Sequence, residues 1–212
     1  MSAAAAFTFN EDTHTYQVDG RIVPGCTRIL EQAGMINFDH VNRDILERKS
    51  ELGSEVHKAC HLFNLKRSFT CDEQVRGYLN SWKETARTLK FEARMSEYQL
   101  VAGVNGMLYG MQIDAEGLVR GAEAILDYKT GAVMAHHAIQ LAGYAAGLYH
   151  PRLETAMARF RSRKRIIVKL QEDGSLAKIH YCEETSDFDV FVSALTTTYW
   201  KMKHEKSYRE KP

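Results

Sequence analysis

The segment from Met107 to Gly131, which reads MLYGMQIDAEGLVRGAEAILDYKTG, decides the fold of this chain. Residues 107–113 and 124–128 have the length and residue types of β-strands, and the glycines within 117–121 predict a turn between them. Residues 97–101 predict a further strand just before this segment, again followed by a glycine-containing turn. The middle of the chain is therefore expected to form three consecutive strands.

The second strand of this segment ends in two charged residues, Asp127 and Lys129. Strand residues two apart share a face, so their side chains project together. A simple hairpin would leave Asp114 near the turn and Asp127 near the far end of its strand. We therefore expect a bulge or a crossing where the two aspartates come together.

The remaining expected elements follow from hydrophobic periodicity and from turn residues. Before the central strands we expect a hairpin over 7–23 that turns at Asp19-Gly20, a short helix over 27–32, a helix that begins near Ser54 and a helix over 72–90. After them we expect a helix over 136–149 ended by His150-Pro151, a hairpin of residues 165–170 with 176–181, and a final helix over 186–203. This order predicts an α/β fold with a central mixed β-sheet flanked by helices, and not a doubly wound parallel sheet.

Composition places the chain among globular proteins. It has 212 residues and a mass of 24.2 kDa, with 44% hydrophobic and 26% charged residues and a formal net charge of +1. These values exclude disorder, collagen and coiled coil. Three prolines and the absence of a Gly/Ser linker predict one domain over residues 1–212. Without an apolar window of membrane length or a signal-peptide pattern, we expect a cytoplasmic protein.

The near-zero charge hides a segregation of charge along the chain. Residues 152–170 carry seven basic side chains and one acidic one, whereas acids predominate over 171–190. If residues 159–165 formed a strand, their alternating arginines would face one way and could follow a nucleic-acid backbone. These residues are Arg159, Arg161, Arg163 and Arg165. The alternative is a solvated, charged face or a loop.

The chemistry of the segment follows from Asp114, Asp127 and Lys129. A hard cation such as Mg²⁺ takes oxygen ligands and one or two protein carboxylates. A neighbouring lysine can orient water and offset charge on a phosphorane, so the three residues predict hydrolysis of a phosphodiester. The alternative is a surface Asp-x-Lys pair. The apolar approach through Ile125-Leu126 instead favours a buried strand, where charges must be paired or used.

Four motifs in order extend this prediction: Gly53-x-x-x-His57, Gly110-x-x-x-Asp114, Asp127-Tyr128-Lys129-Thr130-Gly131 and Gln140-x-x-x-Tyr144. Together they resemble the RecB-like branch of the PD-(D/E)XK nucleases, which includes phage lambda-type and mitochondrial genome-maintenance exonucleases. The stretch from His14 to Leu30 resembles the start of phage and bacterial members. The resemblance covers about residues 7–195.

The resemblance implies a restriction-endonuclease-like core over about residues 51–204, after an N-terminal hairpin and helices over 7–50. It implies that Asp114 and Asp127 bind metal, with Asp127 at a position where many relatives have Glu, and that Lys129 is catalytic. Tyr128 would offer its backbone carbonyl to the metal. His57 would be a further ligand, best suited to Mn²⁺; as an isolated histidine it could equally be a partly exposed polar residue.

Three further residues have alternative roles. By resemblance, Gln140 and Tyr144 would contact the DNA backbone or steady Lys129, whereas on periodicity alone they could cap and pack a helix. Glu97 could add a carboxylate to the metal site or pair with a basic residue on a neighbouring strand.

The resemblance also implies partners and cofactors. We expect an Mg²⁺- or Mn²⁺-dependent deoxyribonuclease, an exonuclease of phage or bacterial DNA recombination and repair, working on DNA in a bacterial or phage-infected cell. A single-strand annealing recombinase would suit it as a partner. Some relatives carry an iron-sulfur cluster held by one early and three late cysteines, but only Cys182 lies late here, so no cluster is expected. The alternatives are a structure-specific or restriction-like endonuclease, and a non-catalytic DNA-binding or assembly protein on the same fold.

Overall fold

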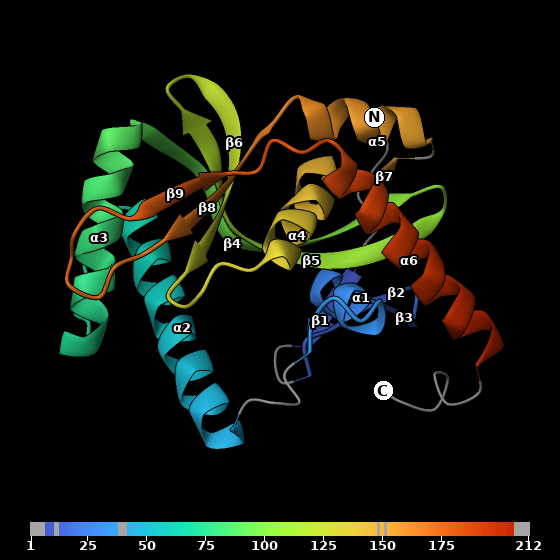
Figure 1. Ribbon diagram of the computed structural model, residues 1–212, viewed down its shortest axis with the longest axis horizontal. Coiled ribbons are helices and arrows are strands. Elements are labelled where there is room, and N and C mark those ends of the chain that lie inside the picture. Colours follow the sequence, from blue (N-terminus) through green and yellow to red (C-terminus); the bar gives the residue numbers. More distant parts are fainter. Residues whose placement is uncertain (1–6, 11–12, 38–41, 148, 151, 206–212) are drawn as a thin grey trace.

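The fold is built on a six-stranded mixed sheet (Figure 1). The computed structural model describes residues 7–10, 13–37, 42–147, 149–150 and 152–205. In the sheet order β7-β4-β5-β6-β8-β9, the strands are β4 (Phe91–Val104), β5 (Met107–Val119), β6 (Ala122–Lys129), β7 (Tyr149–His150), β8 (Lys164–Lys169) and β9 (Lys178–Tyr181). Strands β4, β5 and β6 are antiparallel neighbours, whereas β6 pairs with β8 in parallel. The prediction of an α/β fold with a mixed sheet flanked by helices is confirmed.

Helices cover both faces of this sheet. The five larger ones are α2 (Arg43–Asn64), α3 (Glu73–Leu89), α4 (Ala135–Ala146), α5 (Leu153–Arg161) and α6 (Ser186–His204). Helices α2 and α3 enclose one buried cluster with the sheet, in which Trp82 packs near Leu126. Helices α4, α5 and α6 enclose a second cluster on the opposite face, which contains Phe188 and Ile125. Along β6 the buried side chains therefore alternate between two cores, as expected for a strand covered on both faces.

A small antiparallel sheet precedes the main one. It comprises β1 (Phe7–Asn10), β2 (Thr15–Val18) and β3 (Arg21–Val23), so the expected hairpin has three strands. Asp19 and Gly20 have φ of 50° and 72° and form the predicted tight turn. The ring of Tyr16 lies against Gly110 of β5, where an added Cβ would be 2.1 Å from it. Gly110 thus allows the small sheet to pack against the large one.

Two helix boundaries differ from the prediction. Helix α2 begins at Arg43 and not near Ser54, because the Asn42 side chain caps it by accepting hydrogen bonds from the backbone N–H groups of Asp44 and Ile45 at 2.9 and 3.3 Å. Helix α4 ends at Ala146, before Gly147 with its φ of 69°, so it stops short of the predicted residue 149. The short α1 (Cys26–Gln32) and α3 lie close to their predicted positions. Pro151, the expected stop of α4, lies outside the described residues.

The pairing of β5 with β6 also corrects an expectation. Strand β5 continues to Val119, and the turn falls at Arg120-Gly121. Ala115 therefore pairs with Leu126 at the end of this ladder, and Asp114 and Asp127 are the next residues of the two strands beyond that pair. The register of the longer hairpin thus places the two aspartates at the same end of the ladder. Separately, within the described part of the chain no helix combines the length and apolarity needed to cross a bilayer.

Candidate metal centre

The centre forms where two strands change the face that they present to the cores. On β5, Met111 and Ile113 pack in the cluster beneath α4 and α6, whereas Ala115 packs in the cluster beneath α2 and α3. In a regular strand all three would share one face. The change falls at Asp114, and Glu97 on β4, at the adjacent point of the ladder, has a φ of 47°. This irregularity allows both carboxylates to reach one site beside α2.

Three side chains from three elements meet there. His57 of α2 has its Nδ1 atom 3.3 Å from Glu97 Oε1 and 3.4 Å from Asp114 Oδ1. Its Nε2 atom lies 3.1 Å from the backbone carbonyl oxygen of Tyr128. One ligand atom from each of the three side chains lies within 4.8 Å of the others, a spacing that could hold a metal ion. Two carboxylates and an imidazole form a donor set suited to Mg²⁺ or Mn²⁺.

The other predicted site residues, Asp127 and Lys129, lie on β6, the strand next to β5. Lys129 Nζ is 2.6 Å from Asp127 Oδ2, which confirms that the two side chains project together. The Asp127 side chain is 2% exposed and that of Lys129 is 21% exposed. The backbone N–H of Tyr128 donates to Asp114 Oδ2 at 2.6 Å. This hydrogen bond links the strand that carries Asp127 and Lys129 to the group of His57, Glu97 and Asp114.

Burial and mutual attraction shape the electrostatics of the centre. Burial opposes the charge on His57, but the nearby Asp114 and Glu97 carboxylates prevail and raise its pKa to about 10. Burial likewise opposes ionisation of Asp114, yet His57, Lys129 and the Tyr128 N–H hold its pKa below the usual value. For Asp127, burial and the Asp114 charge raise the pKa to about 6 despite Lys129. The pKa of Lys129 is raised, because the surrounding carboxylates outweigh its burial.

Two residues that the sequence analysis did not single out support this arrangement. Gln112 donates from Nε2 to Glu97 Oε2 at 2.7 Å, which leaves Oε1 facing His57. Asn64 donates to Ser96 Oγ and to the Tyr128 hydroxyl, each at 3.1 Å. Spacing could have revealed both, since Gln112 is two residues from Asp114 on a strand and Asn64 is two helical turns after His57.

A cleft of about 720 Å³ opens beside the centre. Its walls are Ser50, Gly53, Ser54, His57, Lys58 and His61 of α2, Glu97 and Gln99 of β4, and Gln112 of β5. Gly53 and His57, which belong to one sequence motif, thus lie on the same wall.

Gln140 and Tyr144 lie on α4 and contact each other. Gln140 Nε2 donates to the Tyr144 hydroxyl at 2.6 Å and is 3.4 Å from Thr27 Oγ1 of α1. Tyr144 is 5% exposed. Among the described residues these bonds join α4 to α1 and do not reach Lys129.

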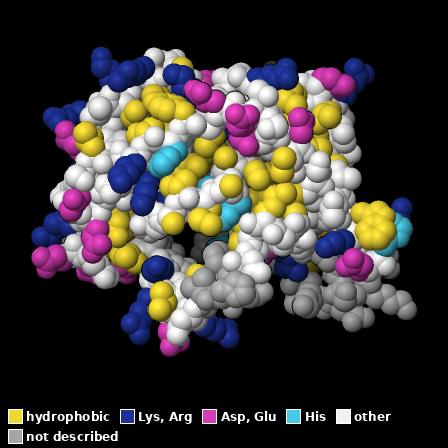
Figure 2. Space-filling model, viewed as in Figure 1, with side chains coloured by type: hydrophobic (Ala, Val, Ile, Leu, Met, Phe, Trp, Pro, Cys, Tyr) yellow, Lys and Arg dark blue, Asp and Glu magenta, His cyan; other side chains and the backbone are white. Residues whose placement is uncertain are grey.

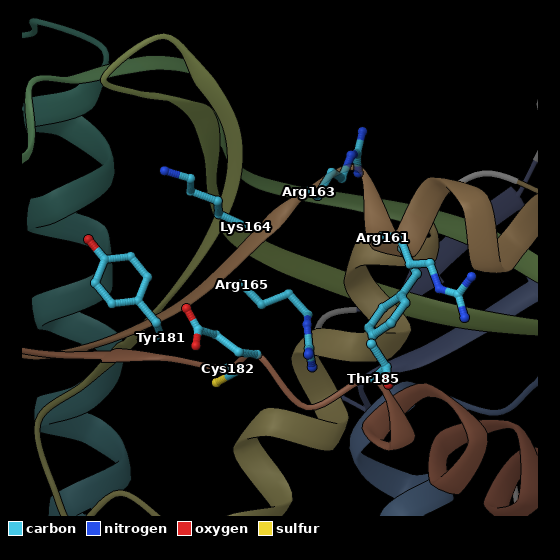
Figure 3. Close-up of a pocket in the computed structure, with 9 residues that line it drawn as sticks. Arg161, Arg163, Lys164, Arg165, Tyr181, Cys182 and Thr185 are labelled. Atoms are coloured by element: carbon cyan, nitrogen blue, oxygen red, sulfur yellow. The ribbon is translucent and has the colours of Figure 1, made fainter.

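The expected basic stripe is wrong in its geometry. Helix α5 continues to Arg161, so Arg159 and Arg161 lie on a helix, while Arg165 lies on β8. Figure 3 shows that Arg161, Arg163 and Arg165 leave the chain in different directions. Arg163 is 2.8 Å from Glu116, and Arg165 is 2.6 Å from Asp187.

Two of the four arginines of the predicted stripe are buried in ion pairs. The side chains of Arg163 and Arg165 are 6% and 3% exposed, and Arg159 pairs with Glu123 at 3.1 Å. Figure 2 shows basic and acidic side chains interspersed on the visible face. Of the four arginines, Arg161 is the one classed as exposed, and its contact with DNA stays a prediction.

Comparison with known proteins adds little to this geometry. Searches against protein-family models and against curated proteins found no match. Among solved structures, the chain is similar to the crystal structure of SSO0001, with 14% sequence identity and a TM-score of 0.33 over 74% of this chain and 76% of that one. A likeness at this score supports no inference about the site.

Proposed function

We propose that this protein is a metal-dependent deoxyribonuclease with a restriction-endonuclease-like core, and that it acts as an exonuclease. The observation that carries the proposal is the convergence of His57, Glu97 and Asp114 beside the Asp127–Lys129 pair. The four sequence motifs support the deoxyribonuclease class and the exonuclease mode.

The residues present fit a divalent cation. Glu97, Asp114 and His57 would hold it, with the Tyr128 carbonyl close by. Glu97 Oε1 is buried and its near partner is the His57 imidazole at 3.3 Å, a contact that a cation bound between the two side chains would replace. When bound, Mg²⁺ or Mn²⁺ supplies Lewis acidity and lowers the pKa of a coordinated water.

Besides the metal ion, the site has a positively charged side chain of its own, Lys129. Asp127 holds its ammonium group at 2.6 Å, and the raised pKa keeps that group protonated at neutral pH. Lys129 can therefore orient a water beside the scissile phosphate and stabilise the negative charge that develops on it. Asp127, expected from the resemblance to bind metal, lies outside the group of His57, Glu97 and Asp114, and its pairing with Lys129 supports a role in positioning the lysine.

A digestion assay tests the proposal. The substrates are end-labelled linear DNA and closed-circular DNA, each with Mg²⁺, with Mn²⁺ and with chelator. We expect metal-dependent release of nucleotides from linear DNA and intact circles, because circles lack ends. Lys129→Ala should retain DNA binding and lose cleavage by about 10²- to 10³-fold, the scale of removing one charge-stabilising donor. Lys178→Ala, on the exposed edge strand β9, is the matched control.

Each other outcome contradicts a defined part of the proposal. Equal cleavage by Lys129→Ala and the parent refutes the assignment of Lys129. Cleavage of circles favours the endonuclease alternative, and DNA binding without metal-dependent cleavage favours the non-catalytic one.

A further inference from the structure

The α2 wall of the cleft continues past His57 with two basic side chains, Lys58 and His61. His61 is one helical turn beyond His57, and both line the same cleft as Glu97. Lys58 is exposed at the edge of this wall, and His61 is half-buried. Neither residue belongs to the group whose ligand atoms lie within 4.8 Å of one another. Both side chains therefore point into the cleft outside the metal centre.

Neither residue is held by a side-chain partner among the described residues. Among the described residues Lys58 forms no ion pair, whereas Lys129, Arg163 and Arg165 are each held by a carboxylate. His61 Nδ1 is buried without a hydrogen-bond partner. Buried polar atoms in proteins normally have partners, so this imidazole has hydrogen-bonding capacity that the described residues do not use.

The rest of the cleft lining indicates an extended polyanion. Ser50, Ser54, Gln99 and Gln112 are neutral hydrogen-bonding side chains, and Glu97, the one carboxylate among the lining residues described, lies at the metal centre. Lysine offers a point charge to a phosphate, and an imidazole N–H donates to a phosphate oxygen in either charge state. The helical rise from His57 to His61 is about 6 Å, so a phosphate beside His61 would be a close neighbour of one at the metal centre.

We propose that Lys58 and His61 form a phosphate-binding pair, which contacts the phosphodiester next to the scissile one and directs a single DNA strand along α2. This inference rests on the proposed nuclease function, because it places the scissile phosphate at the metal centre. It names the substrate as a single polynucleotide strand, bound through its backbone, and it assigns a binding role to two residues outside the four motifs.

Binding measurements test the pair without cleavage. All variants carry Lys129→Ala, and the probe is a fluorescently labelled single-stranded oligonucleotide with Mg²⁺ present, at several salt concentrations. Lys58→Ala should weaken binding by about tenfold and reduce the slope of log affinity against log salt by about 0.7, the value for one phosphate contact on a single strand. His61→Ala should weaken binding by about tenfold, and His61→Gln, which keeps an N–H donor, should recover part of the loss.

The control is Lys49→Ala, because Lys49 is exposed on the same helix nine residues earlier and therefore faces the opposite side. It should change affinity by less than about twofold, the free-energy range of a neutral surface substitution. Calorimetric titration with Mn²⁺ in the absence of DNA should give the same affinity for the Lys58, His61 and Lys49 variants. Circular dichroism confirms that each variant is folded.

Two results would overturn the inference: DNA affinities of Lys58→Ala and His61→Ala equal to that of Lys49→Ala, or a loss of Mn²⁺ affinity in His61→Ala, which would make His61 part of the metal centre. Failure of the nuclease proposal is distinct, because it shows as an absence of metal-dependent cleavage by the parent protein. Weakened DNA binding by the two variants would then identify a binding cleft without catalysis.

Discussion

Replacing Asn64 by alanine should destabilise the protein much more than an ordinary helix substitution. Asn64 accepts a hydrogen bond from Trp82 Nε1 at 2.9 Å and donates to the Tyr128 hydroxyl at 3.1 Å. Both aromatic side chains are fully buried, at 0% exposure. The alanine variant leaves their polar atoms without this partner, in the buried cluster that contains Trp82 and Tyr128.

The magnitude follows from counting these groups. A buried donor or acceptor left unsatisfied costs about 1–3 kcal/mol. Two such groups predict a loss of about 2–6 kcal/mol in the free energy of unfolding, a large share of the about 5–15 kcal/mol typical of a domain. Asn64 also donates to Ser96, whose hydroxyl donates to the backbone carbonyl of Asp114 at 2.9 Å. The variant should therefore weaken Mn²⁺ binding as well.

Urea unfolding followed by circular dichroism measures the effect. Asn80→Ala is the matched control, because Asn80 is exposed on helix α3 and the same substitution there should change stability by no more than about 0.5 kcal/mol. A loss in Asn64→Ala as small as that in Asn80→Ala would refute the reasoning, since it would mean that Trp82 and Tyr128 do not depend on this side chain.

Two further predictions concern the charged interior. Arg165→Ala should lower the free energy of unfolding in urea by about 3–5 kcal/mol, because Arg165 is 3% exposed and its loss leaves Asp187 unpaired. The control Arg161→Ala, at an exposed position, should lower it by less than about 0.5 kcal/mol. Similar losses in the two variants would contradict the burial of the Arg165–Asp187 pair. Burial, Lys129 and His136 lower the pKa of His137 from 6.5 to about 3, so between these values the unfolded state binds more protons than the folded state. His137 should therefore make the free energy of unfolding fall as pH decreases from 6.5 towards 3, by up to about 1.4 kcal/mol per pH unit. Unfolding of His137→Gln over this range should show a shallower fall than unfolding of His204→Gln, and identical slopes would exclude the effect.

Local features could be predicted because they depend on neighbours in the sequence. The Asp19-Gly20 turn follows from two residues that tolerate positive φ, and the Asp127–Lys129 pair follows from the two-residue period of a strand. The apolar Ile125-Leu126 similarly predicts a buried strand, and β6 is buried from Ala124 to Tyr128.

The beginning of α2 could not be predicted from periodicity. Most of residues 43–51 are exposed, so this part of the helix has no apolar stripe to indicate it. The signal was the capping residue Asn42, which is visible in the sequence but is ambiguous without the structure. The prediction of a basic stripe was wrong for a related reason. The sequence alone does not show which arginine forms an ion pair with which carboxylate.

Local patterns in the sequence predicted most of the strands and helices, the mixed α/β class and the candidate metal ligands. Only the tertiary structure decided that Glu97, Asp114 and His57 share one site, and that Arg163 and Arg165 are buried in ion pairs. The physical reason is sequence separation. A strand or turn depends on adjacent residues, whereas the centre depends on the register of β4 against β5 and on the packing of α2 across their irregular point.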